Sequence, residues 1–295
     1  MQDLAIVVVN YNRADFLGQC LEAARRELEF SALDGSIVVV DNASSDDSVA
    51  VARKARGVLV LENRENLGFA AGCNQGGKVS RSRFVLLLNN DVILLRGALG
   101  KLVSFADQHP RLAAVGARLL TPSGQEQLPP MGLFRKTVNR FGKPQFLKWL
   151  PGACLLVRRE ALDRIGWLDA GFFFYNEDLD LGIRLRRDGW KIAYLPAASV
   201  VHHEGKSSDL VRPLAILEGY RGGLRLTAKH YGKKALFFAR LGMKAEIILR
   251  TRRIERKKEA GKILGPKEVA WQEIAPRLKE MIENYAFSGD SETNS

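Results

Sequence analysis

The sequence has few cysteines and no long apolar run. Its 295 residues include only Cys20, Cys73 and Cys154, and no two of them form a CxxC pair. This excludes a disulfide framework and a cysteine zinc site, and it favours a reducing compartment. No stretch approaches the ~20 uncharged apolar residues of a membrane span, and residues 1–10 lack the basic segment of a secretory signal peptide. We therefore expect a soluble, intracellular protein.

Positive charge is concentrated in one segment. The composition is that of a globular chain, with 46% hydrophobic and 26% charged residues, which excludes a disordered or fibrous protein. Of the net charge of +12, residues 229–262 supply +9, from 12 basic and three acidic residues. The remainder, with 33 basic and 30 acidic residues, is close to neutral. We therefore expect no nucleic-acid partner for the fold as a whole.

The first ninety residues alternate between short apolar runs and stretches with helical spacing. The predicted strands are 4–9, 36–40, 58–61 and 84–88, with helices at 16–30, 49–55 and 68–79. Strands that are apolar throughout and alternate with helices predict an α/β fold. Its sheet is mostly parallel and carries helices on both faces.

Several predicted strands end in amide and carboxylate side chains. Asn10 and Asn12 follow the first strand, Asp41 follows the second, and Asn89 and Asp91 follow the fourth. In open α/β sheets, ligands bind beyond the carboxyl ends of the strands. We therefore expect these side chains to converge on one crevice.

The helix predicted at 68–79 begins with small residues. A helix N-terminus presents free N–H groups, and small side chains let a phosphate approach them. The stretch matches neither GxGxxG nor GxxxxGK[ST], so nicotinamide and ATP binding lose their main support.

Asn89 and Asp91 offer the oxygen ligands that Mg²⁺ or Mn²⁺ needs when it also bridges a diphosphate. A single carboxylate is a sparse metal site, so a further ligand is expected. His202 and His203 follow a predicted strand, and a neutral imidazole there could complete the metal shell.

The densest acidic cluster contains Glu177, Asp178 and Asp180, next to the aromatic run 172–174. Carboxylates held against aromatic rings in a cleft have raised pKa values and can accept protons. The same residues also fit the acidic N-terminus of an amphipathic helix, where they would only complement the helix dipole.

Together these segments resemble the family 2 glycosyltransferases, and more narrowly their bacterial rhamnosyltransferase-like branch. The resemblance covers about residues 1–210. It is carried, in order, by VVVNYN (7–12), VVVDNASSDDS (38–48), NLGFAAGCNQG (66–76), LLLNNDV (86–92), PGACLLVRREALDRIGWLD (151–169), FFFYNEDLDLGIRLRRDGW (172–190) and VVHHEGKSS (200–208). It implies a GT-A fold, a nucleotide-sugar donor, a divalent metal (Mg²⁺ or Mn²⁺) and inversion at the anomeric carbon.

The resemblance also implies a donor-binding set. In it, Asp41 binds the base, and Gly152 lies beside the donor sugar. The nucleotide and its diphosphate are surrounded by Asn10, Asn12, Asn66, Gly68, Asn74 and Asn90.

By the same resemblance, Asp178 is the general base and Glu177 orients the acceptor or the loop. Asn89 and Asp91 occupy the family's DxD metal motif, with Asn in place of the first Asp. His202 is the implied histidine ligand, and His203 is the second candidate.

We expect a catalytic domain at 1–212, with a nucleotide-sugar half at about 1–95 and an acceptor half at about 96–212. A basic helical extension follows at 213–287, with a disordered tail at 288–295. The mixture of basic and apolar residues in 229–262 predicts a basic amphipathic helix. It could contact an anionic membrane, or only pack on the catalytic domain with its charged face in water.

The expected function is transfer of rhamnose from dTDP-rhamnose, or of a hexose from a UDP-hexose, to a glycan or lipid-linked acceptor of the bacterial cell envelope. The expected location is the cytoplasm or the inner face of the cell membrane. The alternatives are a nucleotidyltransferase or other nucleotide-binding α/β enzyme, and a non-catalytic membrane-surface adaptor.

Overall fold

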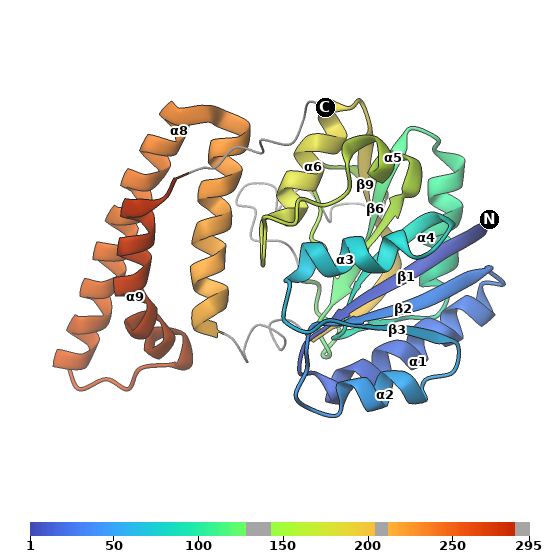
Figure 1. Cartoon of the computed structure of the whole chain (residues 1–295), viewed down its shortest axis with the longest axis horizontal. Coiled ribbons are helices and arrows are strands. Elements are labelled where there is room, and N and C mark those ends of the chain that lie inside the picture. Colours follow the sequence, from blue (N-terminus) through green and yellow to red (C-terminus); the bar gives the residue numbers. More distant parts are fainter. Residues whose placement is uncertain (128–142, 204–211, 287–295) are drawn as a thin grey trace. The chain divides into compact units, whose positions relative to one another are not determined.

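The computed structural model describes residues 1–127, 143–203 and 212–286 (Figure 1). Its chain forms two compact units. The first consists of Met1–Gly171 with Glu177–Ser207, and the second of Phe172–Asn176 with Ser208–Ser295. The tail expected at 288–295 lies outside the described residues.

The first unit begins with four parallel strands in the order β3-β2-β1-β4. They and their connecting helices confirm the predicted alternation. The observed bounds are β1 Gln2–Asn10, α1 Ala14–Phe30, β2 Gly35–Asp41, α2 Ser48–Lys54, β3 Val58–Glu62, α3 Phe69–Lys78 and β4 Ser82–Asn89.

Beyond β4 the sheet is mixed. Strand β8 runs antiparallel to both β4 and β6, whereas β9 is parallel to β6 and antiparallel to β5 and β7. The remaining elements are β5 Val92–Leu94, α4 Ala98–Gln108, β6 Leu112–Leu120, β7 Gln145–Phe146, β8 Cys154–Arg158, α5 Arg159–Ile165, α6 Glu177–Arg187 and β9 Lys191–His202. The parallel arrangement expected of the sheet thus holds for its first four strands and for β6 with β9.

Helices cover both faces of this sheet because its strands are apolar on both sides. Ile6 and Val8 pack into the core on the face of α1 and α4. Val7, between them, faces α3 and α5 and packs in the other core. Figure 1 shows α3 on one side of β1 and β2, with α1 and α2 on the opposite side.

Helix α3 lies unusually close to the sheet, because glycines face the strands. A methyl group at Gly76 would come within 2.5 Å of Val7 Cγ1, and one at Gly72 within 2.9 Å of Val9 Cγ1. The small residues after Asn66 therefore have a packing role, whatever they also do for a ligand.

The second unit is a helical bundle. Helix α8 (Arg212–Glu259) is interrupted at Gly232, whose φ of 78° lies in the left-handed region. Its two arms pack on each other, with Gly223 near Met243, and on α9 (Pro266–Asn284), where Trp271 donates a hydrogen bond to Thr251. This confirms the helical pattern predicted beyond residue 213.

The segment Phe172–Asn176 belongs to the second unit although it comes directly before α6. Asn176 Nδ2 donates to the carbonyl of Gly219 at 3.2 Å, and the Arg225 guanidinium lies 5.6 Å from the centre of the Phe172 ring. The two halves expected within residues 1–212 stay a prediction.

No helix in the described part of the chain has the length and apolarity needed to cross a bilayer.

We predict that Gly76→Ala destabilises the protein by about 1–3 kcal/mol, the usual cost of overpacking a core. Gly18 is a matched control, because a methyl group there would meet Val51 Cγ1 at an ordinary 3.5 Å. Gly18→Ala should stabilise helix α1 by about 0.5–1 kcal/mol. Thermal unfolding of both variants tests this, and equal melting temperatures would contradict it.

Candidate active site

The predicted site residues share one edge of the sheet because of strand direction. Strands β1, β2 and β4 are parallel, and β8 runs antiparallel to both β4 and β6. Strands β6 and β9 therefore point the same way as β4. As a result, the carboxyl ends of four strands lie on one edge of the sheet, and these ends are Asn10, Asp41, Asn89 and His202. The start of β8, after Gly152, lies on the same edge.

The buried amide of Asn10 connects the ends of three strands. Its Nδ2 donates to Asp41 Oδ1 at 3.0 Å, and its Oδ1 accepts from Asn90 Nδ2 at 2.8 Å. The side chains of Asn10, Asp41 and Asn90 are almost fully buried. The convergence of these strand ends, expected from the sequence, is therefore present as a direct network.

Ser44, which lies in the segment 38–48 but was not among the predicted site residues, completes this network. Its main-chain N–H donates to Asp41 Oδ2 at 2.8 Å, and its hydroxyl donates to Asp41 Oδ1 at 2.6 Å. The same hydroxyl accepts from the N–H of Asn12 at 2.8 Å, and Asn12 Oδ1 accepts from the N–H of Ser45 at 2.7 Å. These bonds fix the loops after β1 and β2 against each other.

The turn before α3 is held to the same loops. Asn66 Oδ1 accepts from the N–H of Gly68 at 3.0 Å, and Asn42 Nδ2 donates to the Gly68 carbonyl at 3.2 Å. Gly68 has a φ of 83°, which disfavours any other residue there.

Asn74 lies further along α3, and both ends of its amide bind the main chain of Leu168, at 2.8 and 3.1 Å. Its observed role is to hold the chain after α5, and a contact from Asn74 to a donor stays a prediction.

Asp91 and His202 meet because β5 pairs with β9, in a register that aligns Val92 with His202. His202 Nε2 lies 3.5 Å from Asp91 Oδ1, and both side chains are buried or nearly so. The structure therefore brings together a carboxylate and an imidazole more than a hundred residues apart.

Gln127 fixes the orientation of the His202 ring. Its Nε2 donates to the His202 carbonyl at 2.7 Å, so its Oε1 is the atom 2.8 Å from His202 Nδ1. A carbonyl oxygen can only accept, so Nδ1 carries a proton, and the lone pair of a neutral His202 is on Nε2, facing Asp91. No motif in the sequence marked Gln127.

The other two metal candidates are placed differently. The main-chain carbonyl of Asp91 accepts from the N–H of His203, whose ring contacts the Phe16 ring in a tilted arrangement, with 4.8 Å between the centroids. The N–H of Asn89 donates to Ala153, and its carbonyl accepts from the Cys20 thiol. A metal contact from the Asn89 amide stays a prediction. Within the described residues no three His, Cys, Asp or Glu side chains converge as a metal site.

The acidic cluster lies at the first turn of α6. Asp178 Oδ1 accepts from the N–H of Leu179 at 2.8 Å, and the carboxylate also accepts from the N–H of Gly152, just before β8. A methyl group on Gly152 would approach only the Phe69 ring, at 3.5 Å. Asp178 and Gly152, 26 positions apart in the sequence, are thus direct neighbours.

Burial dominates the protonation of this cluster. It raises the pKa of Asp178, although hydrogen bonds from the main-chain N–H groups of Leu179, Gly152 and Asp178 itself act in the opposite direction. Burial also raises the pKa of Glu177, and the negative charge of Asp178 adds to that shift. The pair therefore favours a neutral Glu177 beside an ionised Asp178.

Asp180, the third carboxylate, has a structural role. It is fully buried and forms an ion pair with Arg184 at 2.6 Å, while Arg184 also donates to the Ile165 carbonyl. Asp180 is therefore held within the fold by Arg184, and proton acceptance by Asp178 stays a prediction.

A family model described as glycosyl transferase family 2 matches residues 5–166, more than half of the chain. The chain belongs to this family. Glycosyl transfer is therefore favoured over nucleotidyl transfer and over a non-catalytic adaptor.

Relatives of this family 2 glycosyltransferase include rhamnosyltransferases. An N-acetylglucosaminyl-diphospho-decaprenol L-rhamnosyltransferase of Mycobacterium tuberculosis is 28% identical over 240 residues, covering 70% of this chain and 77% of the relative. The rhamnosyltransferase WbbL of Escherichia coli is 22% identical over 268 residues, covering 78% and 93%.

Solved structures of the same fold are GT-A glycosyltransferases. A mannosyltransferase from Pyrobaculum calidifontis, in complex with GDP-Man and Mn²⁺, has a TM-score of 0.58 at 16% identity, covering 94% of this chain and 87% of that one. The expected α/β fold of GT-A type is thus confirmed.

We predict that Glu177→Gln gains stability over the wild type as the pH rises. Above the ordinary carboxyl pKa, Glu177 ionises in the unfolded chain but keeps its proton when folded. The folded state then binds more protons, so wild-type stability falls with pH. The glutamine variant lacks this penalty, which is on the order of 1–3 kcal/mol. Melting temperatures at about pH 5 and pH 8 should diverge, and a constant difference would contradict the protonated assignment.

Proposed function

We propose that this enzyme transfers a glycosyl group, with inversion, from a nucleoside-diphosphate sugar to a glycan or lipid-linked acceptor of the cell envelope. Asp178 is the general base, and Asp91 and His202 hold a divalent metal. The observation that supports this most is Asp178 itself, a carboxylate of raised pKa fixed to Gly152 at the carboxyl edge of the sheet.

The raised pKa suits Asp178 to proton abstraction. A carboxylate whose pKa lies nearer neutrality takes a proton from a hydroxyl more readily than an ordinary surface carboxylate does. In the proposed step the acceptor oxygen forms a bond to the anomeric carbon and its proton moves to Asp178. The bond between that carbon and the diphosphate oxygen breaks, and the nucleoside diphosphate leaves.

Glu177 supports this step by staying neutral. Its Oε2 is buried and has no hydrogen-bond partner among the described residues. An ionised carboxylate in that position would be costly. We propose that Glu177 orients the acceptor or the loop before α6. Because one base acts without a second carboxylate as nucleophile, the expected outcome is inversion.

The residues present fit a divalent metal. Asp91 Oδ1 and His202 Nε2 lie 3.5 Å apart, so a carboxylate oxygen and an imidazole nitrogen are close enough to bind the same ion. Asn89 and the donor diphosphate would complete the shell. A bound Mg²⁺ or Mn²⁺ would offset the charge on the departing diphosphate. GT-A neighbours solved with Mn²⁺ support this proposal.

The donor-binding proposal uses the remaining strand-end residues. The base lies beside Asp41, and the sugar lies beside Gly152, where a side chain would take its space. The other proposed donor contacts are Asn10, Asn12, Asn66, Gly68, Asn74 and Asn90. Relatives named as rhamnosyltransferases favour dTDP-rhamnose over a UDP-hexose.

A lipid-linked acceptor is favoured by the name of the mycobacterial relative, whose acceptor is attached to a diphospho-decaprenol. We propose that transfer takes place at the inner face of the cell membrane, with 229–262 as the segment that contacts it. This part of the proposal is independent of the catalytic assignment.

We predict that Asp178→Asn abolishes transfer while donor affinity stays within about threefold, because the amide has the size and shape of the carboxylate but cannot accept the proton. Turnover of a panel of nucleotide sugars and calorimetric binding of the donor check this. Asp188→Asn makes the same change at an exposed carboxylate at the other end of α6 and should retain activity. Full turnover by Asp178→Asn would remove the base assignment.

We predict that Gln127→Ala weakens Mn²⁺ binding by about 10–100-fold, the usual effect of losing the partner that orients a metal-ligating histidine. Titration of Mn²⁺ followed by electron paramagnetic resonance, with UDP or dTDP present, measures this without turnover. Gln125→Ala is the control, because Gln125 is exposed on the same loop. Equal affinities in both variants would exclude Gln127 from positioning His202.

A further inference from the structure

The second arm of α8 has two apolar faces rather than one. One of them, with Ile247 and Ile254, is buried in the bundle core against α9. At about 100° per residue, Phe238, Leu241 and Leu249 project within about 80° of one another on the opposite side of the helix. These three side chains, which we call the apolar stripe, are 68%, 57% and 66% exposed.

The apolar stripe is more than scattered surface hydrophobicity. Its residues follow helical spacing over three turns, as a buried helix face does, yet they contact water. Phe237 and Ile248 flank it and are also exposed, and Ile263 in the loop after α8 is 97% exposed. Contiguous exposed apolar surface of this kind marks a protein or membrane contact.

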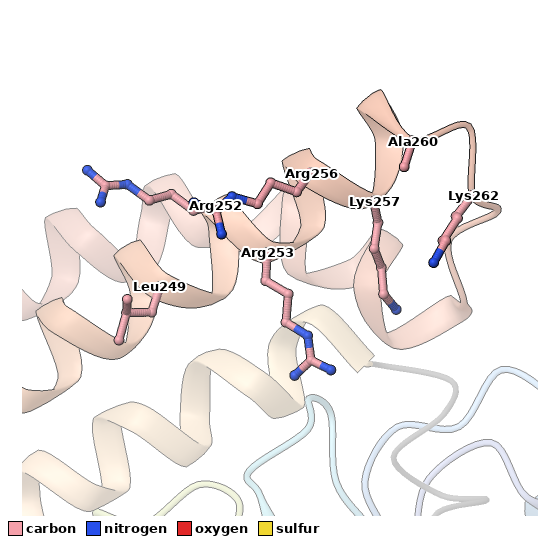
Figure 2. A pocket seen from close by; sticks show the side chains of 7 residues that line it. All are labelled: Leu249, Arg252, Arg253, Arg256, Lys257, Ala260 and Lys262. Atoms are coloured by element: carbon pink, nitrogen blue, oxygen red, sulfur yellow. The ribbon is translucent and has the colours of Figure 1, made fainter.

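A basic cleft continues the apolar stripe. Arg252 and Arg256 fall in the same angular sector as Phe238, one to two turns beyond Leu249. They line a cavity of about 370 Å³. Figure 2 shows Leu249 on one side and Lys262 on the other, with the side chains of Arg253, Arg256 and Lys257 between them. The cleft consists of Arg252, Arg253, Arg256, Lys257 and Lys262, with Leu249 and Ala260.

The lining of this cleft contains five cationic side chains and no acidic one. Lys257 forms an ion pair with Glu268 of α9, which offsets one charge. Arg252, Arg253, Arg256 and Lys262 are exposed. Such a cluster attracts phosphate groups, and apolar side chains beside it match the acyl region under a layer of phosphates.

We propose that this face of α8 docks on an anionic lipid bilayer. The basic cleft binds lipid phosphates, and the apolar stripe enters the interface between headgroups and acyl chains. A soluble polyanion would use the cleft but not the stripe, and an apolar protein partner would use the stripe but not the cleft. This proposal deepens the proposed function. It rests on that function in one respect only, the expectation that the enzyme meets a lipid-linked acceptor at the membrane.

The test is co-sedimentation of the full-length protein with vesicles of phosphatidylcholine alone or with one quarter phosphatidylglycerol. Binding is expected only to the anionic vesicles. The double variant Arg252→Gln/Arg256→Gln should bind them about 30-fold more weakly, since each basic residue near an anionic surface contributes about a fivefold factor. The double variant Phe238→Ser/Leu241→Ser should lose binding by tenfold or more.

The matched control is Arg56→Gln/Arg111→Gln, which removes the same two charges from exposed positions in the first unit. It should bind like the wild type. An equal loss in this control, equal binding to neutral vesicles, or no binding at all would overturn the proposal. Undiminished binding by the stripe variant, with displacement by free pyrophosphate, would assign the cleft to a soluble polyanion instead.

Donor hydrolysis measured without vesicles separates this proposal from the proposed function. Vesicle binding by a protein that hydrolyses no nucleotide sugar would contradict the enzyme assignment and leave the docking face intact. Hydrolysis by a protein that does not bind vesicles would support the enzyme assignment and contradict the docking face.

Discussion

The side-chain amide of Asn10 is the contact on which the site depends. It is fully buried, so both of its ends need partners, and it finds them in Asp41 at the end of β2 and Asn90 after β4. Both contacts are possible because β2 and β4 end next to the end of β1. The network therefore converts three separate loops into one rigid floor. Replacing Asn10 with an apolar residue would remove one hydrogen bond from the buried side chain of Asp41 and one from that of Asn90, which is why a polar group is needed in this position.

The close approach of helix α3 to strand β1 also positions the turn before the helix. Glycines at 72 and 76 let the helix lie against the valines of β1, and that approach places the turn before α3 within hydrogen-bonding reach of Asn42.

At the first turn of α6, two electrostatic effects act in opposite directions. There a helix N-terminus favours an anion, but burial of two adjacent carboxylates disfavours two charges. The result is a pair whose members differ in protonation, with Glu177 neutral and Asp178, the proposed base, ionised.

The sequence by itself determined much of the first unit. Apolar runs bounded by polar residues gave the four parallel strands, because a buried strand must be apolar and its end must not be. The ordered motifs indicated the family. Asp178 and Asp91 were identified as candidates because a carboxylate next to a buried apolar segment is unfavourable unless it has a structural or chemical role. The basic segment was also visible from composition, although its apolar residues could not be divided between two faces. Ile247 packs in the bundle core, whereas Leu249 does not.

Only the tertiary structure decided which of these residues meet. The contact between Asp91 and His202 depends on β5 pairing with β9, and the one between Asp178 and Gly152 depends on the first turn of α6 lying next to the turn before β8. Neither Gln127 nor Ser44 was among the predicted site residues, because a single amide or hydroxyl is common on any surface and becomes informative only through its partners. Local sequence specifies local conformation through side-chain shape and burial. The pairing of distant strands depends on the free energy of the whole sheet, and that pairing is what brings the site together.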